Sequence, residues 1–206
     1  MAGHDDWLKL ATESDDDIRE RILTGYKDGK PFTPYVPTVA LPGGLDSVLD
    51  FGCGLGRNFP YLKRVARSVA GFDLPPMIAR CRTVASDSVD LLSDDWEQIK
   101  TLHFDLIVAS LVVQHIEPAP LRTYLADFPR VSGLIYLLTR TGTDFSENIF
   151  DVIAETGQFT PGECVQVDHD PITHQLKVVG RSTFEEARQS GMDGHYELLL
   201  HATGRG

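Results

Sequence analysis

Asp50 and the three glycines after it are the residues of this sequence whose types and spacing best suit ligand chemistry. Gly52, Gly54 and Gly56 alternate with other residues directly after an apolar run. Because glycine has no Cβ, a ligand can lie against the bare backbone of such a turn. The carboxylate of Asp50 would repel a pyrophosphate but attract a cationic group. The pattern predicts a loop that binds a positively charged nucleotide-like cofactor.

The spacing of the glycines argues against a dinucleotide. The dinucleotide fingerprint is G-x-G-x-x-G, and Arg57 and Phe59 stand where its third glycine would be. A second acid, Asp73, closes the next short apolar run and could accept hydrogen bonds from both hydroxyls of a ribose. Two acids after two successive predicted strands fit a charged nucleoside.

At this point the sequence resembles the class I S-adenosylmethionine (SAM)-dependent methyltransferases. Residues 50–56 match the D/E-x-G-x-G-x-G loop of that family in full, and residues 104–116 resemble its fourth strand and the segment that follows. Residues 93–96 stand where its adenine-contacting acid lies. These features occur in the family's order over about residues 45–140.

The resemblance implies SAM as cofactor, S-adenosylhomocysteine as product and a set of binding residues. Asp50 is expected at the amino-acid end of SAM, Asp73 at the ribose, and Asp94 or Asp95 at the adenine edge. Leu74 and Met77 are expected to line the adenine pocket. The candidate cofactor-binding residues are Asp50, Phe51, Gly52, Cys53, Gly54, Gly56, Asn58, Asp73, Leu74, Met77, Asp94, Asp95, Trp96, Ser110 and Leu111.

Four residues are candidates for the acceptor side of the site. His115 lies five residues after Ser110, where a neutral imidazole could take a proton from an acceptor hydroxyl or instead order the loop beside the cofactor. Arg140, just past the fifth predicted strand, could hold an anionic acceptor or be a solvated charge. Tyr26 and Tyr35 could belong to a lid over the acceptor, and plain packing on the domain explains them equally well.

The elements that must position these residues alternate between strand and helix, as in a parallel sheet covered on both faces. The predicted strands lie near 46–51, 68–73, 88–91, 104–110 and 133–139. The predicted helices lie near 57–67, 76–84, 95–100, 119–128 and 146–156. A hairpin over 163–168 and 174–179, a helix over 182–190 and a strand over 196–200 should follow. The expected fold is α/β and Rossmann-like, with a mostly parallel sheet of seven or slightly more strands and an antiparallel C-terminal pair.

The first 44 residues form a separate region of the sequence. Ser14 and the three acids after it predict a helix start, and residues 30–37 carry three prolines that impose an extended path. We therefore expect an N-terminal helix and proline-rich lid over residues 1–44, and a SAM-binding methyltransferase domain over residues 45–206.

Charge and composition limit the partners of the protein. The 206 residues include 19 Lys and Arg and 30 Asp and Glu, for a formal net charge of −11. A nucleic-acid enzyme usually needs a basic surface, so nucleic acid is a disfavoured partner and a small molecule the favoured acceptor. No apolar run is long enough for a membrane span, and no signal peptide is apparent, so a cytoplasmic location is expected. The oligomeric state is not predicted.

The cysteines and histidines do not predict a metal site. Three cysteines lie far apart without a C-x-x-C pair, which argues against disulfides and structural zinc. The cluster from Asp168 to His174 fits a turn better than a set of metal ligands, so no metal is expected.

The expected activity is therefore transfer of the methyl group of SAM to an oxygen, nitrogen or carbon nucleophile of a small molecule. Two alternatives stay open. An RNA- or protein-directed methyltransferase would share the cofactor site but show a basic or extended groove. A catalytically silent SAM-binding regulatory module would lack an enclosed acceptor pocket.

Overall fold

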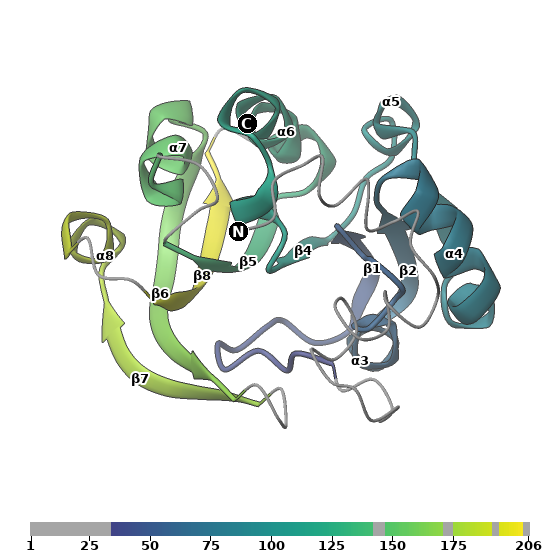
Figure 1. Ribbon diagram of the computed structural model, residues 1–206, viewed down its shortest axis with the longest axis horizontal. Helices are drawn as coiled ribbons and strands as arrows, with labels where there is room; N and C mark the ends of the chain where they lie inside the picture. The colour runs from purple at the N-terminus through teal and green to yellow at the C-terminus, as the bar shows by residue number, and fades with distance from the viewer. Residues whose placement is uncertain (1–33, 142–146, 171–174, 191–193, 204–206) are drawn as a thin grey trace.

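The protein is built on one eight-stranded sheet with the order β3-β2-β1-β4-β5-β8-β6-β7 (Figure 1). The computed structural model describes residues 34–141, 147–170, 175–190 and 194–203. The strands are β1 (Leu45–Phe51), β2 (Ala66–Phe72), β3 (Leu91–Ser93), β4 (Leu106–Ser110), β5 (Leu134–Arg140), β6 (Phe159–His169), β7 (Leu176–Ser182) and β8 (His195–Ala202). The predicted Rossmann-like fold is confirmed, with eight strands.

Strands β1 to β5 are parallel, and β1 lies at their centre. Its residue Asp50 pairs with Gly71 of β2 on one side and with Val108 of β4 on the other. Strand order reverses between β1 and β4, and ligands bind beyond the carboxyl ends of the strands at such a point. The carboxyl end of β1 is where the glycine loop begins.

The C-terminal strands close the sheet in antiparallel fashion. Strand β8 lies between β5 and β6 and is antiparallel to both, and β7 pairs with β6 at the edge. This arrangement brings the amino-terminal end of β8 beside the carboxyl end of β5, so His195 is the partner of Arg140.

Helices cover both faces of the sheet. They are α3 (Phe59–Val65), α4 (Pro75–Ala85), α5 (Trp96–Ile99), α6 (Pro118–Val131), α7 (Ile149–Thr156) and α8 (Phe184–Ser190). The apolar cores show that α5 to α8 share one face, while α3, α4 and the chain around Tyr35 and Val39 share the other. Within the described residues, no helix is long and apolar enough to cross a bilayer.

The third strand exists but lies later than the predicted position near 88–91. Ser86–Ser88 form a 3-10 turn, and β3 begins at Leu91. The side chain of Asp90 accepts a hydrogen bond of 2.7 Å from the backbone N–H of Val69 and one of 2.6 Å from Lys63. These contacts hold the chain at the start of the sheet, so regular pairing begins only after Asp90.

Residues 34–44, the described part of the N-terminal region and called the N-terminal arm below, are packed against the sheet. Tyr35 and Val39 are buried in the core that also contains α3 and α4. The backbone N–H of Thr38 donates to Glu197 Oε1 at 2.7 Å, and its hydroxyl donates to Oε2. Tyr136 also donates to Glu197 Oε1, at 2.8 Å. This buried carboxylate on β8 therefore fixes the path of the arm, whereas Tyr26 and the helix predicted after Ser14 lie outside the described residues.

Candidate functional site

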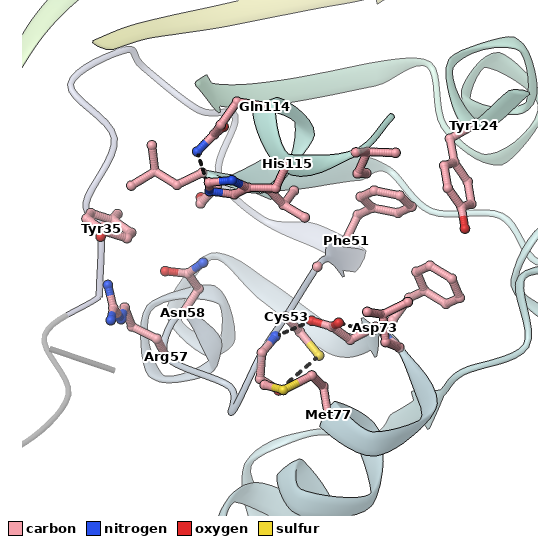
Figure 2. A pocket seen from close by; sticks show the side chains of 18 of the residues that line it. Tyr35, Phe51, Cys53, Arg57, Asn58, Asp73, Met77, Gln114, His115 and Tyr124 are labelled. Atoms are coloured by element: carbon pink, nitrogen blue, oxygen red, sulfur yellow. Dashed lines mark hydrogen bonds between the residues drawn. The ribbon is translucent and has the colours of Figure 1, made fainter. Parts of the chain in front are cut away.

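A cavity of about 520 Å³ opens at the carboxyl ends of the parallel strands. The predicted site residues that line it are Tyr35, Phe51, Gly52, Cys53, Gly54, Asn58, Asp73, Leu74, Met77, Ser110, Leu111, His115 and Arg140. Figure 2 shows two halves: Phe51, Asp73, Met77 and Tyr124 lie on one side, and Tyr35, Arg57, Gln114 and His115 on the other.

The three glycines adopt left-handed backbone conformations, with φ of 73° at Gly52, 56° at Gly54 and 84° at Gly56. A Cβ on Gly52 would lie 2.3 Å from a methyl group of Val112, and one on Gly56 would lie 2.5 Å from the Phe59 ring. The packing of the protein itself therefore requires glycine at both positions. Sequence reasoning attributed all three glycines to close approach of a ligand, but Gly56 does not line the cavity.

Asp73 lies on the cavity wall and holds the glycine loop in place. Its Oδ2 accepts from the backbone N–H of Gly54 and its Oδ1 from that of Leu74, both at 2.7 Å. Burial raises the pKa of this carboxyl to about 6, and the two hydrogen bonds oppose the rise. Because each carboxylate oxygen has two lone pairs, Asp73 can still accept one hydrogen bond at each oxygen from a ligand.

Asp50 lies behind the cavity wall and is fully buried. Asn58 Nδ2 lies 3.5 Å from its Oδ1. Burial raises the pKa of Asp50 to about 7, with the Asn58 contact lowering it and the charge of Asp73 raising it further. Within the described part of the chain, Asp50 Oδ2 and Asn58 Oδ1 are buried acceptors without a hydrogen-bond partner. Leaving such a group unpaired costs about 1–3 kcal/mol, so a ligand with N–H donors at Asn58 would be favoured.

Aromatic side chains form the cavity wall on the same side as Asp73. Phe51, Phe72 and Tyr124 line the cavity, and Tyr124 meets the rings of Phe51 and Phe72 at 5.0 and 6.1 Å between centroids. Trp96 packs edge-on against Tyr124 at 5.2 Å. This wall offers flat apolar surface of the kind that an adenine ring requires.

Asp94, Asp95 and Trp96 do not reach the wall of the cavity. Asp94 and Asp95 are exposed, and Asp95 Oδ1 caps α5 by accepting from the backbone N–H groups of Glu97 and Gln98. Trp96 Nε1 donates to Asp127 at 3.0 Å. Their contact with adenine stays a prediction.

The chain after β4 is strained where it borders the cavity. Leu111 has a φ of 54°, a conformation that costs a bulky residue about 1–3 kcal/mol and tends to occur at functional sites. Its N–H donates to the carbonyl of Leu138 at 2.6 Å, which holds the turn against β5. The turn places Gln114 and His115 at the wall of the cavity.

Gln114 fixes the orientation of His115. The hydroxyl of Thr139 donates to Gln114 Oε1 at 3.2 Å, so the NH₂ of Gln114 faces His115 Nε2, also at 3.2 Å. In this arrangement Nε2 accepts a hydrogen bond and the imidazole proton is on Nδ1.

Two arginines, Arg57 and Arg140, line the cavity. Arg57 stacks over the ring of Tyr35, with its Cζ 5.0 Å from the ring centroid. Burial raises the pKa of Tyr35, and Arg57 opposes the rise. Arg140 lies beside His195, whose pKa is lowered by burial and by the charge of Arg140.

Residues 48–132 match the family model described as a methyltransferase domain. The matched segment contains the glycine loop, Asp73 and the strained turn after β4. Over this segment the chain is similar to methyltransferase domains. A search of curated protein sequences finds no match.

Solved structures of methyltransferases share the fold. The N-methyltransferase NodS from Bradyrhizobium japonicum WM9, in complex with S-adenosylhomocysteine, superposes with a TM-score of 0.53 at 16% identity, over 79% of this chain and 80% of NodS. A TehB-like SAM-dependent methyltransferase from Corynebacterium glutamicum gives 0.53 at 19% identity, over 80% and 83% of the chains. The mitomycin 7-O-methyltransferase MmcR gives 0.55 at 9% identity, over 77% of this chain and 49% of MmcR.

The residues that line the cavity fit SAM as cofactor. Asp73 can accept from ribose hydroxyls, the aromatic wall suits adenine, and Asn58, which lines the cavity, suits the ammonium group of the methionine moiety. Sequence reasoning missed the cavity residues Phe72, Tyr124, Arg57, Gln114 and His195. Tyr124 and His195 carried no local signal, because ordinary helix and strand residues look alike until the sheet order is known.

Proposed function

We propose that the protein is a class I SAM-dependent methyltransferase and that it transfers the methyl group of SAM to an oxygen, nitrogen or carbon nucleophile of a small-molecule acceptor. The observation that carries the proposal is that a single cavity is lined both by the residues suited to the cofactor and by Tyr35, His115 and Arg140. Its volume of about 520 Å³ lies in the range of small-molecule sites.

The proposed roles on the cofactor side follow from the contacts of each residue. Asp73 would accept from the ribose, while Leu74 and Met77 would pack against adenine together with the aromatic wall. Asn58 would accept from the ammonium group, with the charge of Asp50 behind it. Adenine contacts by Asp94 or Asp95 would require the loop after β3 to move toward the cavity.

SAM, when bound, supplies a methyl carbon that a good leaving group already activates. The protein therefore needs mainly to hold the acceptor in line with that carbon and close to it. Tyr35, fixed through the arm and Glu197, would form the outer wall that orients the acceptor. We further propose that residues 1–44 complete this wall as a lid.

His115 is the proposed proton acceptor for a hydroxyl nucleophile. Its Nε2 carries the lone pair and is hydrogen-bonded to Gln114, so an acceptor hydroxyl would have to take the place of the Gln114 amide before the proton could transfer. If that exchange does not occur, His115 acts as a positioning residue for the turn after β4.

Two observations favour a small acceptor over RNA or protein. The formal net charge of −11 opposes binding to a polyanion. Tyr35 also lines the cavity and is buried in the core together with Val39, which supports a bounded pocket. NodS and MmcR are named for transfer to nitrogen and to oxygen, so the shared fold leaves the acceptor atom open.

The experiment is a screen of SAM turnover. The full-length protein and the Asp73→Ala variant would be incubated with SAM and pooled metabolites, and methylated products would be detected by mass spectrometry. Total RNA and a protein extract would serve as parallel acceptors. Products that form only with the wild-type protein and only in the metabolite pools support the proposal. Methyl incorporation into RNA or protein, or SAM binding without any turnover, contradicts it.

A further inference from the structure

We propose that the acceptor carries a carboxylate group and that Arg140 and His195 bind this group at the acceptor end of the cavity. The inference rests on the proposed function and deepens it, because it names the chemical class of the acceptor. It would also explain why a strongly acidic protein places positive charge in its cavity.

The two residues lie directly opposite each other on neighbouring strands. Arg140 ends β5, and His195 opens β8 as its direct antiparallel partner. Opposite residues of an antiparallel pair lie on the same face, with Cβ atoms about 4.5–5.5 Å apart. Both side chains line the cavity. A carboxylate between them could therefore contact both at once.

The backbone around the pair is held rigid. The N–H of Thr141 donates to the carbonyl of Gly194 at 3.1 Å, and the N–H of Gly194 donates to Thr141 Oγ1 at 3.2 Å. These reciprocal bonds join the ends of β5 and β8 directly beyond the pair. A preformed site binds its ligand without an added ordering cost.

The charges around the cavity favour an anion on this side. Arg57 and Arg140 line it, whereas Asp73 and Glu117 are the acids among the lining residues. Asp73 is engaged with the glycine loop on the cofactor side. The charge of Asp168 raises the pKa of His195 and so opposes the effect of Arg140. Positive charge in a cleft raises the local concentration of anions, which would counter the repulsion from a net charge of −11.

A carboxylate fits the pair better than a phosphate does. The guanidinium of Arg140 presents a planar fork that matches the two oxygens of a carboxylate. Burial and the charge of Arg140 lower the pKa of His195, so its imidazole would be a neutral N–H donor near pH 7. The positive charge of Arg140 and the neutral N–H donor of His195 together match the single negative charge of a carboxylate.

Arg57 is better placed than Arg140 to meet the carboxylate of SAM itself. It directly follows the glycine loop and is held by its stacking on Tyr35. Arg57 would therefore bind the carboxylate of SAM, and Arg140 would bind the carboxylate of the acceptor. A binding experiment can separate these two roles.

The test uses the full-length protein saturated with S-adenosylhomocysteine. Sodium benzoate and sodium acetate are titrated as carboxylate probes, with benzamide and acetamide as neutral counterparts, and binding is followed by NMR. The variants are Arg140→Gln and His195→Asn. The matched control is Arg130→Gln, which removes an arginine whose side chain is 80% exposed on α6.

We expect at least one acid to bind saturably and its amide to bind more weakly by about tenfold or more. Arg140→Gln should weaken the acid by about tenfold or more, since it removes charge-assisted hydrogen bonds, and the Arg130 variant should behave as wild type. Equal binding of acids and amides, or no saturable binding of either acid, overturns the inference. An equal loss of S-adenosylhomocysteine affinity in Arg140→Gln would assign Arg140 to the cofactor and also overturns it. Failure of the wild-type protein to bind S-adenosylhomocysteine would instead refute the proposed function.

Discussion

Replacing Asp50 with asparagine should make the cofactor-free protein more stable above neutral pH. Asp50 is fully buried, and its Oδ2 has no partner among the described residues. Its pKa is raised to about 7 in the folded protein because burial penalises the charged form. Asparagine keeps the shape, carries no charge and could donate to the unpaired Asn58 Oδ1.

The magnitude and sign follow from the raised pKa. A rise from 3.8 to about 7 corresponds to about 4 kcal/mol, at about 1.4 kcal/mol per pKa unit. Well below pH 3.8 the carboxyl is protonated in both folded and unfolded chains, so its ionisation costs no stability there. Between about pH 4 and 7 the unfolded chain ionises while the folded protein keeps the proton, so the free energy of unfolding falls as the pH rises, and the loss is complete above about pH 7. The Asp50→Asn variant carries no charge at this position, so its free energy of unfolding does not fall for this reason.

The assay is urea unfolding of the cofactor-free wild type and Asp50→Asn at several pH values from 4.5 to 8.5 (about one unit apart). Over this range the stability difference in favour of the variant should grow with pH by about 3 kcal/mol, or roughly 6–12 °C in Tm for a chain of this size. Asp46→Asn is the control, because this carboxylate is 76% exposed. A difference that stays constant with pH, or a variant that is less stable than wild type at pH 8.5, would refute the reasoning.

Three further predictions concern binding and catalysis. The protein should bind SAM and S-adenosylhomocysteine but not NAD in titration calorimetry, and micromolar NAD affinity without SAM affinity would contradict the cofactor assignment. Asp73→Ala should weaken SAM binding by at least about tenfold, since it removes hydrogen bonds to a charged group; unchanged SAM affinity in a variant that melts like wild type would exclude Asp73 from the site. His115→Ala should lower kcat by roughly 10²–10⁴-fold with SAM affinity unchanged if His115 is the base. Weaker SAM binding in that variant would assign the residue to ordering of the turn.

Much of the fold and the cofactor side could be predicted because their signals are local. The alternation of apolar strands and helices identified most elements of the sheet within a few residues, since burial on both faces of a parallel strand leaves a continuous apolar run. The short strand β3 was misplaced because Leu91–Ser93 is too brief to carry such a pattern. Asp73 was identified because an acid at the end of a buried strand is visible in sequence, and the structure places it at the glycine loop.

The sequence by itself determined the glycine loop, the parallel strands and the two acids at their ends, because backbone conformation and burial pattern depend on residues that are close along the chain. Only the tertiary structure decided that Val112 and Phe59 require two of the glycines, and that Gln114 fixes His115. It also decided that His195 faces Arg140, because β8 inserts between β5 and β6. The insertion of β8 depends on contacts between segments far apart along the chain, and no short stretch of residues encodes it.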